Sequence, residues 1–194
     1  MENKVINLII DFVNGAYETT KDGFYEIRDG KHAIFGCRYL LNQIIREYEL
    51  PNDHYLVSEG ALAEWKRLGL EKENINKYYY HEIIKLNGVY KYYRYKGADK
   101  TPTLEESDWF RFNDIFHLEH IVPIKMIIKR LFELKKNNQL TQENVADTLD
   151  KIYICRMLKR EDRNIKAKYN RGTLNYKEIV NTIYKEAGIV VKDN

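Results

Sequence analysis

A glutamate and a histidine stand side by side at Glu119-His120, at the end of an apolar run and three residues before Pro123. A carboxylate can hold a hard divalent ion, and a neighbouring imidazole can accept a proton from water near neutral pH. Hydrolysis of a phosphodiester needs both actions. His117 precedes the pair by two residues, and alternation along a strand predicts that His117 and Glu119 share one face.

Two strands and a helix are expected to position these groups. The stretch Trp109–Leu118 is predicted to form one strand that leads into the pair, and Lys151–Cys155 is predicted to form another. Between them, helical spacing over Ile124–Leu134 and a second helix capped by Thr141 predict a helical insertion. The polar run Lys159–Asn164 is expected to open a further helix. The predicted order is therefore strand, helical insertion, strand, helix.

The N-terminal half is predicted to be a mixture of helices and hairpins. Residues 1–15, Ala33–Tyr48 and Gly60–Leu68 are predicted helices, the last ended by Gly69. Residues 21–31 carry an Asp-Gly pair between alternating aromatic and charged residues, which predicts a small hairpin.

A tyrosine-rich stretch, Tyr78–Lys96, holds seven of the sixteen tyrosines. We interpret it as a pair of amphipathic strands with Asn87-Gly88 as the turn, because tyrosine suits a half-buried sheet. Tyrosines interleaved with cations can also stack on bases and pair with phosphates, which is typical of a nucleic-acid surface. The two interpretations are compatible.

Composition excludes several classes of protein. The net charge is only +3 over 194 residues, so no strong overall field points to nucleic acid. Cys37 and Cys155 are too few for a disulfide framework or a cysteine-based zinc site. The short apolar run Val5–Ile10 meets Asp11 at once, so it predicts neither a signal peptide nor a membrane span. We expect a cytoplasmic protein.

The segment from about residue 109 to residue 170 resembles the HNH endonucleases. Their ββα-metal motif carries an Asp-His or Glu-His pair followed by Ile-Val-Pro or a similar run, and then an asparagine from the motif's helix. Here these are Glu119-His120, Ile121-Val122-Pro123 and Asn164. The resemblance is strongest to the HNH domain of the RNA-guided CRISPR nucleases, in which an acid stands at the position of His117 and a polar run matches Arg160–Asn164.

The resemblance implies roles for individual residues. Glu119 and Asn164 would bind Mg²⁺ or Mn²⁺, and His120 would be the general base. His117 would be a further metal ligand or a residue that contacts the ligands and orients them. No structural zinc is expected, since no cysteine pairs flank the motif. Two departures stand out: glutamate replaces the commoner aspartate, and the insertion between Pro123 and Asp150 is long. Asn170 and Asn175 are alternatives to Asn164 as the asparagine ligand.

Basic residues near the motif and in the tyrosine-rich stretch are candidates for contacts with the DNA backbone. The same residues could instead form an ordinary solvated surface. The candidates are Arg160, Arg163, Lys166, Lys168, Lys91, Arg94 and Lys96.

These observations predict an α+β protein. It would contain a ββα-metal HNH motif with a helical insertion in residues 101–194, and an N-terminal mixed α/β lobe for DNA recognition or dimerisation in residues 1–100. The expected activity is metal-dependent cleavage of double-stranded DNA at specific sites, as in a homodimeric type II restriction enzyme. The alternatives are a homing or phage HNH nuclease, a nickase, a toxin nuclease, and a nucleic-acid-binding module without catalysis.

Overall fold

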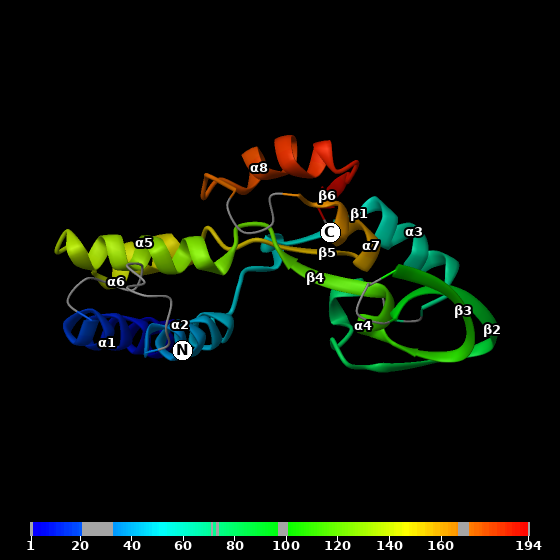
Figure 1. The fold of residues 1–194 in the computed structure, drawn as a ribbon, viewed down its shortest axis with the longest axis horizontal. Coiled ribbons are helices and arrows are strands. Elements are labelled where there is room, and N and C mark those ends of the chain that lie inside the picture. The colour runs from blue at the N-terminus through cyan, green and yellow to red at the C-terminus, as the bar shows by residue number, and fades with distance from the viewer. Residues whose placement is uncertain are drawn as a thin grey trace. The chain divides into compact units, whose positions relative to one another are not determined.

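The computed structural model describes residues 2–20, 33–70, 72, 74–96, 101–166 and 171–193 (Figure 1). The fold is α+β, with helices, a mixed four-stranded sheet and a two-stranded antiparallel hairpin. Contacts divide the chain into two compact units, each built from several segments. Unit 1 contains residues 1–51, 122–153 and 169–176, and unit 2 contains residues 52–121, 154–168 and 177–194. The functional division near residue 100 stays a prediction.

Unit 1 is a helical bundle. It consists of α1 (Glu2–Thr20), α2 (Ala33–Arg46), α5 (Ile124–Lys136) and α6 (Gln142–Leu149), which lie side by side in Figure 1. Buried side chains recur along α5 at helical spacing and form the face that packs in the bundle. The Thr141 hydroxyl caps α6 by accepting the Asn144 N–H at 3.2 Å. All four helices were predicted, and α1 is longer than expected.

Unit 2 contains both sheets. The four-stranded sheet has the order β4 (Phe116–His120), β5 (Ile154–Leu158), β1 (Tyr55–Ser58), β6 (Val191–Asp193). Strand β5 is antiparallel to β4 and parallel to β1, and β6 is antiparallel to β1. The predicted order of strand, helical insertion, strand and helix is confirmed as β4, α5–α6, β5 and α7 (Lys159–Asn164). The second strand begins at Ile154, three residues later than predicted.

The remaining elements are mostly short. They are η1 (Asn52–His54), α3 (Glu59–Arg67), η2 (Ile75–Lys77), α4 (Phe112–Ile115), α8 (Tyr176–Ile179) and the π-helix η3 (Val180–Tyr184). The predicted helix that ends at Gly69 is confirmed as α3, and Gly69 has a φ of 61°. The hairpin predicted over residues 21–31 lies outside the described residues.

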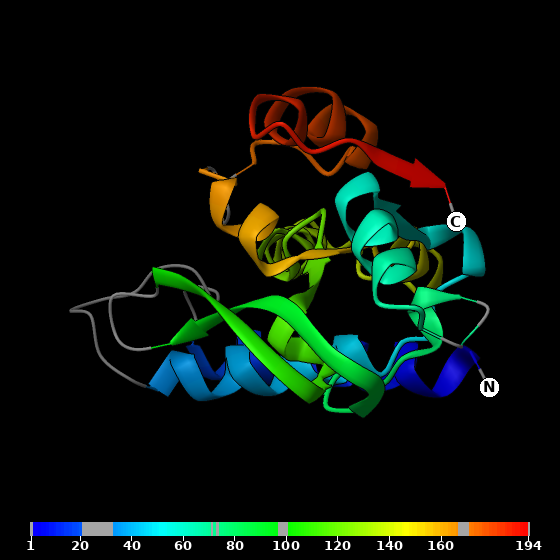
Figure 2. The same cartoon turned by 90° about the vertical axis from the view of Figure 1, so that its right-hand side faces the viewer.

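The predicted turn at Asn87-Gly88 is wrong. One long strand, β2 (Ile83–Lys96), runs through it and pairs with β3 (Thr101–Arg111), as the curved hairpin of Figure 2 shows. Residues 86–89 lie opposite the single residue Asp108, so this stretch is a bulge, and Gly88 has a φ of 137° there. Glycine tolerates that backbone conformation. The pattern of a two-residue turn and that of a glycine bulge are alike in sequence.

The single strand predicted over Trp109–Leu118 is also wrong, because the helical turn α4 separates β3 from β4. The Asp114 carboxylate accepts the Arg111 N–H at 2.9 Å and forms an ion pair with Arg94 at 3.2 Å. Phe112 and Ile115 are buried in the core of unit 2. The turn carries the chain from the hairpin into the four-stranded sheet, and so it positions β4, the strand that carries the acid-histidine pair.

Candidate metal centre

Three side chains of unit 2 converge between β4 and α7. His117 and Glu119 come from β4, and Asp162 comes from α7. One ligand atom from each lies within 4.8 Å of the others. The His117 Nε2 is 3.5 Å from Glu119 Oε2 and 3.7 Å from Asp162 Oδ1. The prediction that His117 and Glu119 share one face of a strand is therefore confirmed.

The sheet register explains how the site is built. Glu119 pairs with Cys155 and His117 pairs with Met157, and directly opposed residues point to the same face of a sheet. Cys155 and Met157, the cross-strand neighbours of the two β4 side chains, are fully buried. Helix α7 contacts both strands, which brings Asp162 to that face. Burial raises the pKa of the Cys155 thiol. Its sulfur is not part of the group of ligand atoms that converges at His117, Glu119 and Asp162.

Glu161, next to Asp162, fixes the position of α7. Its Oε2 accepts the Leu158 N–H at 2.8 Å and the Ser58 hydroxyl at 2.6 Å. Gly60 in α3 lies so close that a Cβ there would overlap the Glu161 carboxylate. Helix α7 is thus held against β1 and α3 by a carboxylate that turns away from Asp162.

The donor set suits a divalent cation. Glu119 and Asp162 have side chains about nine-tenths buried, and two carboxylates at 4.8 Å or less repel each other by roughly 3 kcal/mol or more at an effective dielectric constant of about 20. A bound cation would offset this repulsion. Carboxylate oxygens suit Mg²⁺ and Mn²⁺, whereas an imidazole ligand favours transition metals. Mn²⁺ satisfies both preferences, although the triad does not identify the ion.

The other predicted site residues fall in different places. His120 is the last residue of β4 and pairs with Ile154, and strand alternation gives it the face opposite to Glu119. The chain bends at Ile121 and Val122 directly after it. Asn164 is exposed at the end of α7. Their roles as general base and ligand stay predictions.

Asp162 is the residue that sequence reasoning missed. It stands in the run Arg160–Asn164 that was already matched to the HNH pattern, two residues before the asparagine to which that pattern drew attention. Its signal was present in the sequence, because an acid in a helix that follows the second strand can reach a carboxylate on the first strand.

The predicted basic residues lie in different surroundings. Lys91 and Arg94 in β2 are paired with acids of β3 and α4: Lys91 with Glu106 at 2.9 Å, and Arg94 with Glu105 at 3.1 Å and with Asp114. Lys166 is exposed after α7. Lys168 and the side chain of Lys96 lie outside the described residues.

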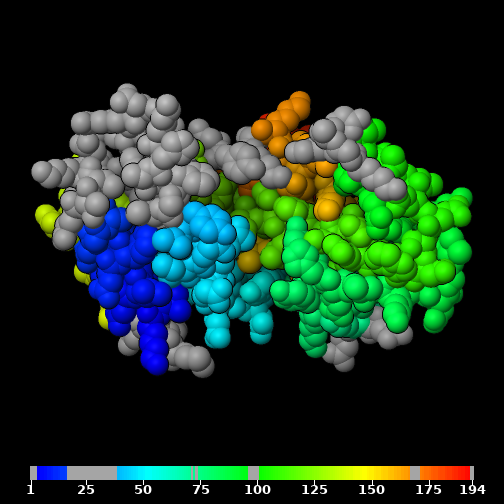
Figure 3. Space-filling view, turned by 60° about the horizontal axis from the view of Figure 1, so that its bottom comes forward, coloured from blue at the N-terminus to red at the C-terminus, as the bar shows by residue number. Residues whose placement is uncertain are grey.

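Arg160 and Arg163, by contrast, lie over tyrosine rings of the hairpin. The Arg160 Cζ is 5.0 Å from the centre of the Tyr93 ring, and the Arg163 Cζ is 3.5 Å from the centre of the Tyr95 ring. The surface view shows α7, in orange, beside the hairpin, in green (Figure 3). The structure therefore brings together two predicted regions, the tyrosine-rich stretch and the basic run.

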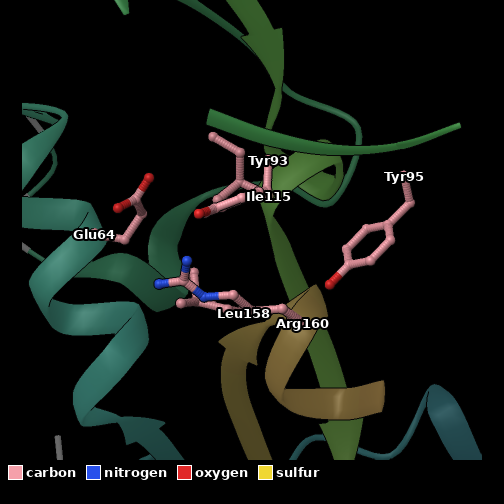
Figure 4. Close-up of a pocket in the computed structure, with 6 residues that line it drawn as sticks. All are labelled: Glu64, Tyr93, Tyr95, Ile115, Leu158 and Arg160. Atoms are coloured by element: carbon pink, nitrogen blue, oxygen red, sulfur yellow. The ribbon is translucent and has the colours of Figure 1, made fainter. Parts of the chain in front are cut away.

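A shallow pocket opens where these elements meet. Figure 4 shows Glu64 of α3, Arg160 of α7 and two β2 tyrosines around it, with Ile115 and Leu158 completing the lining. Glu64 forms an ion pair with Arg67 at 2.7 Å, and its hydrogen bond raises the pKa of Arg67. The acid's charge is thus balanced within α3.

A larger groove in unit 2, of about 650 Å³, lies between the end of α3 and the first half of β2. It contains the Lys72–Glu82 ion pair, at 2.6 Å, among mainly apolar side chains. It lacks the converging acids of the triad, so its size does not make it the better candidate for catalysis.

No helix in the described part of the chain is long and apolar enough to cross a membrane. In comparisons with known proteins, the chain matches no family model, no curated protein and no solved structure.

Proposed function

We propose that this protein is a metal-dependent phosphodiester hydrolase of the HNH type that cuts DNA. The observation that carries the proposal is the convergence of His117, Glu119 and Asp162 on one face of an antiparallel strand pair covered by a helix. The same segment supplies the Glu-His-Ile-Val-Pro run that resembles the HNH motif. The residue pattern and the geometry both support hydrolysis at a metal site, and Glu119 is common to the two.

The roles of the residues follow from their chemistry. Glu119 and Asp162 offer carboxylate oxygens to the ion, and His117 is a ligand or orients the two acids. A divalent ion held there would stabilise charge on the scissile phosphate and on the departing 3′ oxygen. An imidazole takes the proton from the attacking water, and such acid-base assistance is typically worth ~10²–10⁴-fold in rate.

Two histidines compete for the role of base. The HNH resemblance assigns it to His120, the last residue of β4. His117 is the imidazole that lies at the acids. We favour His120 as the base because His117, between two carboxylates, is placed to hold them.

The choice of a site-specific, homodimeric restriction enzyme within this class rests on the resemblance alone. A dimer with two-fold symmetry would match a palindromic duplex and cut both strands. Mg²⁺ and Mn²⁺ are the proposed cofactors.

The test is incubation of supercoiled plasmid with the wild type and four variants, each with Mg²⁺, Mn²⁺ or EDTA. The variants are Glu119→Gln, His120→Ala, His117→Ala and Arg130→Ala, the last an exposed arginine of α5 that serves as the control. We expect metal-dependent cleavage by the wild type and by Arg130→Ala, and loss of at least ~10²-fold in rate for His120→Ala.

Other outcomes have distinct meanings. A greater loss for His117→Ala than for His120→Ala would exchange the two histidine roles. Discrete bands would support site-specific cutting, and a smear would exclude it. DNA binding that ignores metal, with no scission by any divalent ion, would leave a binding module in which the triad is a buried ion-pair network.

A further inference from the structure

The tyrosines and arginines beside the triad form a paired surface, hereafter the Arg–Tyr surface, made of Tyr93, Tyr95, Arg160 and Arg163. The two tyrosines are two residues apart on β2 and share one face of the hairpin. The two arginines are three residues apart on α7 and share one face of the helix. Each arginine therefore meets one tyrosine, and the pairs follow one another in order.

This surface is next to the triad. Within the single helix α7, Glu161 binds Ser58, Asp162 faces His117, and the arginines on either side of them face the hairpin. Asp162 and the two arginines thus stand on the same six-residue helix, so a strand whose phosphate lies at Asp162 has the Arg–Tyr surface within reach. Tyr93 is 42% exposed and both arginines are exposed, whereas Tyr95 is half-buried, so the surface is most accessible at the Tyr93–Arg160 pair.

The chemistry of the surface favours bases over backbone. Bases stack on aromatic rings and on guanidinium planes, whatever the sequence. An arginine held over a ring has its plane oriented and still offers N–H donors to phosphate. Two such pairs in succession match the pattern of a platform for consecutive bases.

A duplex would gain little from the same hairpin. Binding of a duplex depends on many cationic side chains that neutralise its phosphates. On this hairpin, Lys91 and Arg94 already form ion pairs with Glu106, Glu105 and Asp114. Asp108 adds a further exposed acid on β3. With these cations neutralised by neighbouring acids, stacking is the stronger source of affinity, and stacking needs bases that are not paired within a helix.

We propose that the Arg–Tyr surface binds an unpaired stretch of the substrate strand beside the scissile phosphate, by stacking of its bases on the Tyr93–Arg160 and Tyr95–Arg163 pairs. This inference rests on the proposed nuclease function, because only a nuclease would have this strand as its substrate. It adds the class of DNA on which the enzyme acts. The enzyme then acts at a single-stranded segment of DNA, such as a flap, an overhang or a bubble, which negative supercoiling can also open in a plasmid. On this point the inference competes with the palindromic duplex expected from the restriction-enzyme resemblance.

The first test changes the ligand and leaves the protein intact. Fluorescence anisotropy in EDTA compares a labelled oligothymidylate with an abasic deoxyribose oligomer of the same length and charge. We expect the wild type to prefer the oligothymidylate by about tenfold or more, from base stacking. Equal affinity for the two would overturn the inference, as would tighter binding of a blunt duplex at the same salt concentration.

Protein variants then locate the effect. Tyr93→Leu and Arg160→Lys should each reduce the preference for the base-containing oligomer, since Arg160→Lys keeps the charge and removes the plane. Arg130→Ala removes an exposed arginine of unit 1 and should keep the preference. A preference that survives in Tyr93→Leu, Arg160→Lys and the combination of both would place stacking elsewhere and contradict the assignment.

The two proposals fail separately. Binding in EDTA requires no catalysis, so stacking can be observed in a protein that never cuts. Metal-dependent cleavage of plasmid by a protein that binds both oligomers equally would keep the nuclease and reject the unpaired substrate.

Discussion

Ser58 in β1 donates its hydroxyl hydrogen to Glu161 in α7 at 2.6 Å, although the two residues are 103 positions apart in the chain. The same hydroxyl oxygen accepts the Ala61 N–H at 3.0 Å and so caps α3. Glu161 in turn caps α7 through the Leu158 N–H. One chain of hydrogen bonds therefore joins the N-termini of α3 and α7. By fixing α7, it also fixes the position of Asp162.

Replacing Ser58 with alanine should destabilise unit 2 and loosen Asp162. Loss of a helix cap together with a hydrogen bond to a half-buried carboxylate is expected to lower the free energy of unfolding by about 1–3 kcal/mol. Urea unfolding would measure the change, and Mn²⁺ titration would show weaker binding. Thr141→Ala, which removes the cap of α6 in unit 1, is the control. It should cost about 1 kcal/mol and leave Mn²⁺ binding unchanged.

Gly60→Ala should be more damaging than its size suggests. The added Cβ would overlap the Glu161 carboxylate, so α7 must shift or Glu161 must leave Ser58. Gly15 in α1 has no atom within 4 Å of the corresponding position, and alanine there should stabilise the helix by up to about 1 kcal/mol. Thermal unfolding of the two variants should move in opposite directions, and a stabilised Gly60→Ala would show that the close approach does not exist in solution.

The sequence predicted the parts of the fold that local patterns control. The unit 1 helices follow from apolar spacing and from the Thr141 cap, and the order of strands and helices around the triad follows from alternating patterns. The wrong turn prediction has a physical cause. Asn87-Gly88 suits a turn as well as a bulge, and only the pairing of β2 with β3, set by distant residues, decides between them.

The site was predicted in part for the same reason. His117 and Glu119 are two residues apart on one strand, so alternation alone brings them together. Asp162 joins them only through the packing of α7 on β4 and β5, and that packing depends on Ser58 and Gly60. The contact of Arg160 with Tyr93 likewise depends on the hairpin of β2 and β3, whose turn was predicted at the wrong position.

Acid should weaken the folded state through Glu82. The Lys72 ammonium, and then the Tyr79 N–H, lower the pKa of Glu82 below its usual value of 4.5. A carboxylate with a lowered pKa stabilises the fold fully above pH 4.5, and this contribution is lost as the pH falls through the folded-state value. Unfolding by urea at a series of pH values should show a gap between wild type and Glu82→Gln that closes in acid. Lys72→Met should narrow the gap at neutral pH, and a gap independent of pH would contradict the assignment.

The identity of the helix ligand can be decided between Asp162 and Asn164. Asp162 lies at the acids and is buried, whereas Asn164, the ligand expected from the HNH resemblance, is exposed at the end of α7. If Asp162 is the ligand, Asp162→Asn should weaken Mn²⁺ binding by roughly tenfold or more, and Asn164→Ala should leave it nearly unchanged.

Calorimetric titration of Mn²⁺ gives the affinity directly, and unfolding provides an independent readout. A saturating ion at 100 times its Kd should stabilise the wild type by about 2.7 kcal/mol, and EDTA should remove that gain. Asp162→Asn should lose most of it. The removal of one of two neighbouring carboxylates also relieves their repulsion, so the metal-free Asp162→Asn protein should be at least as stable as the metal-free wild type. A variant destabilised without metal, and a wild type indifferent to Mn²⁺, would together show that Asp162 serves the fold through His117 and binds no ion.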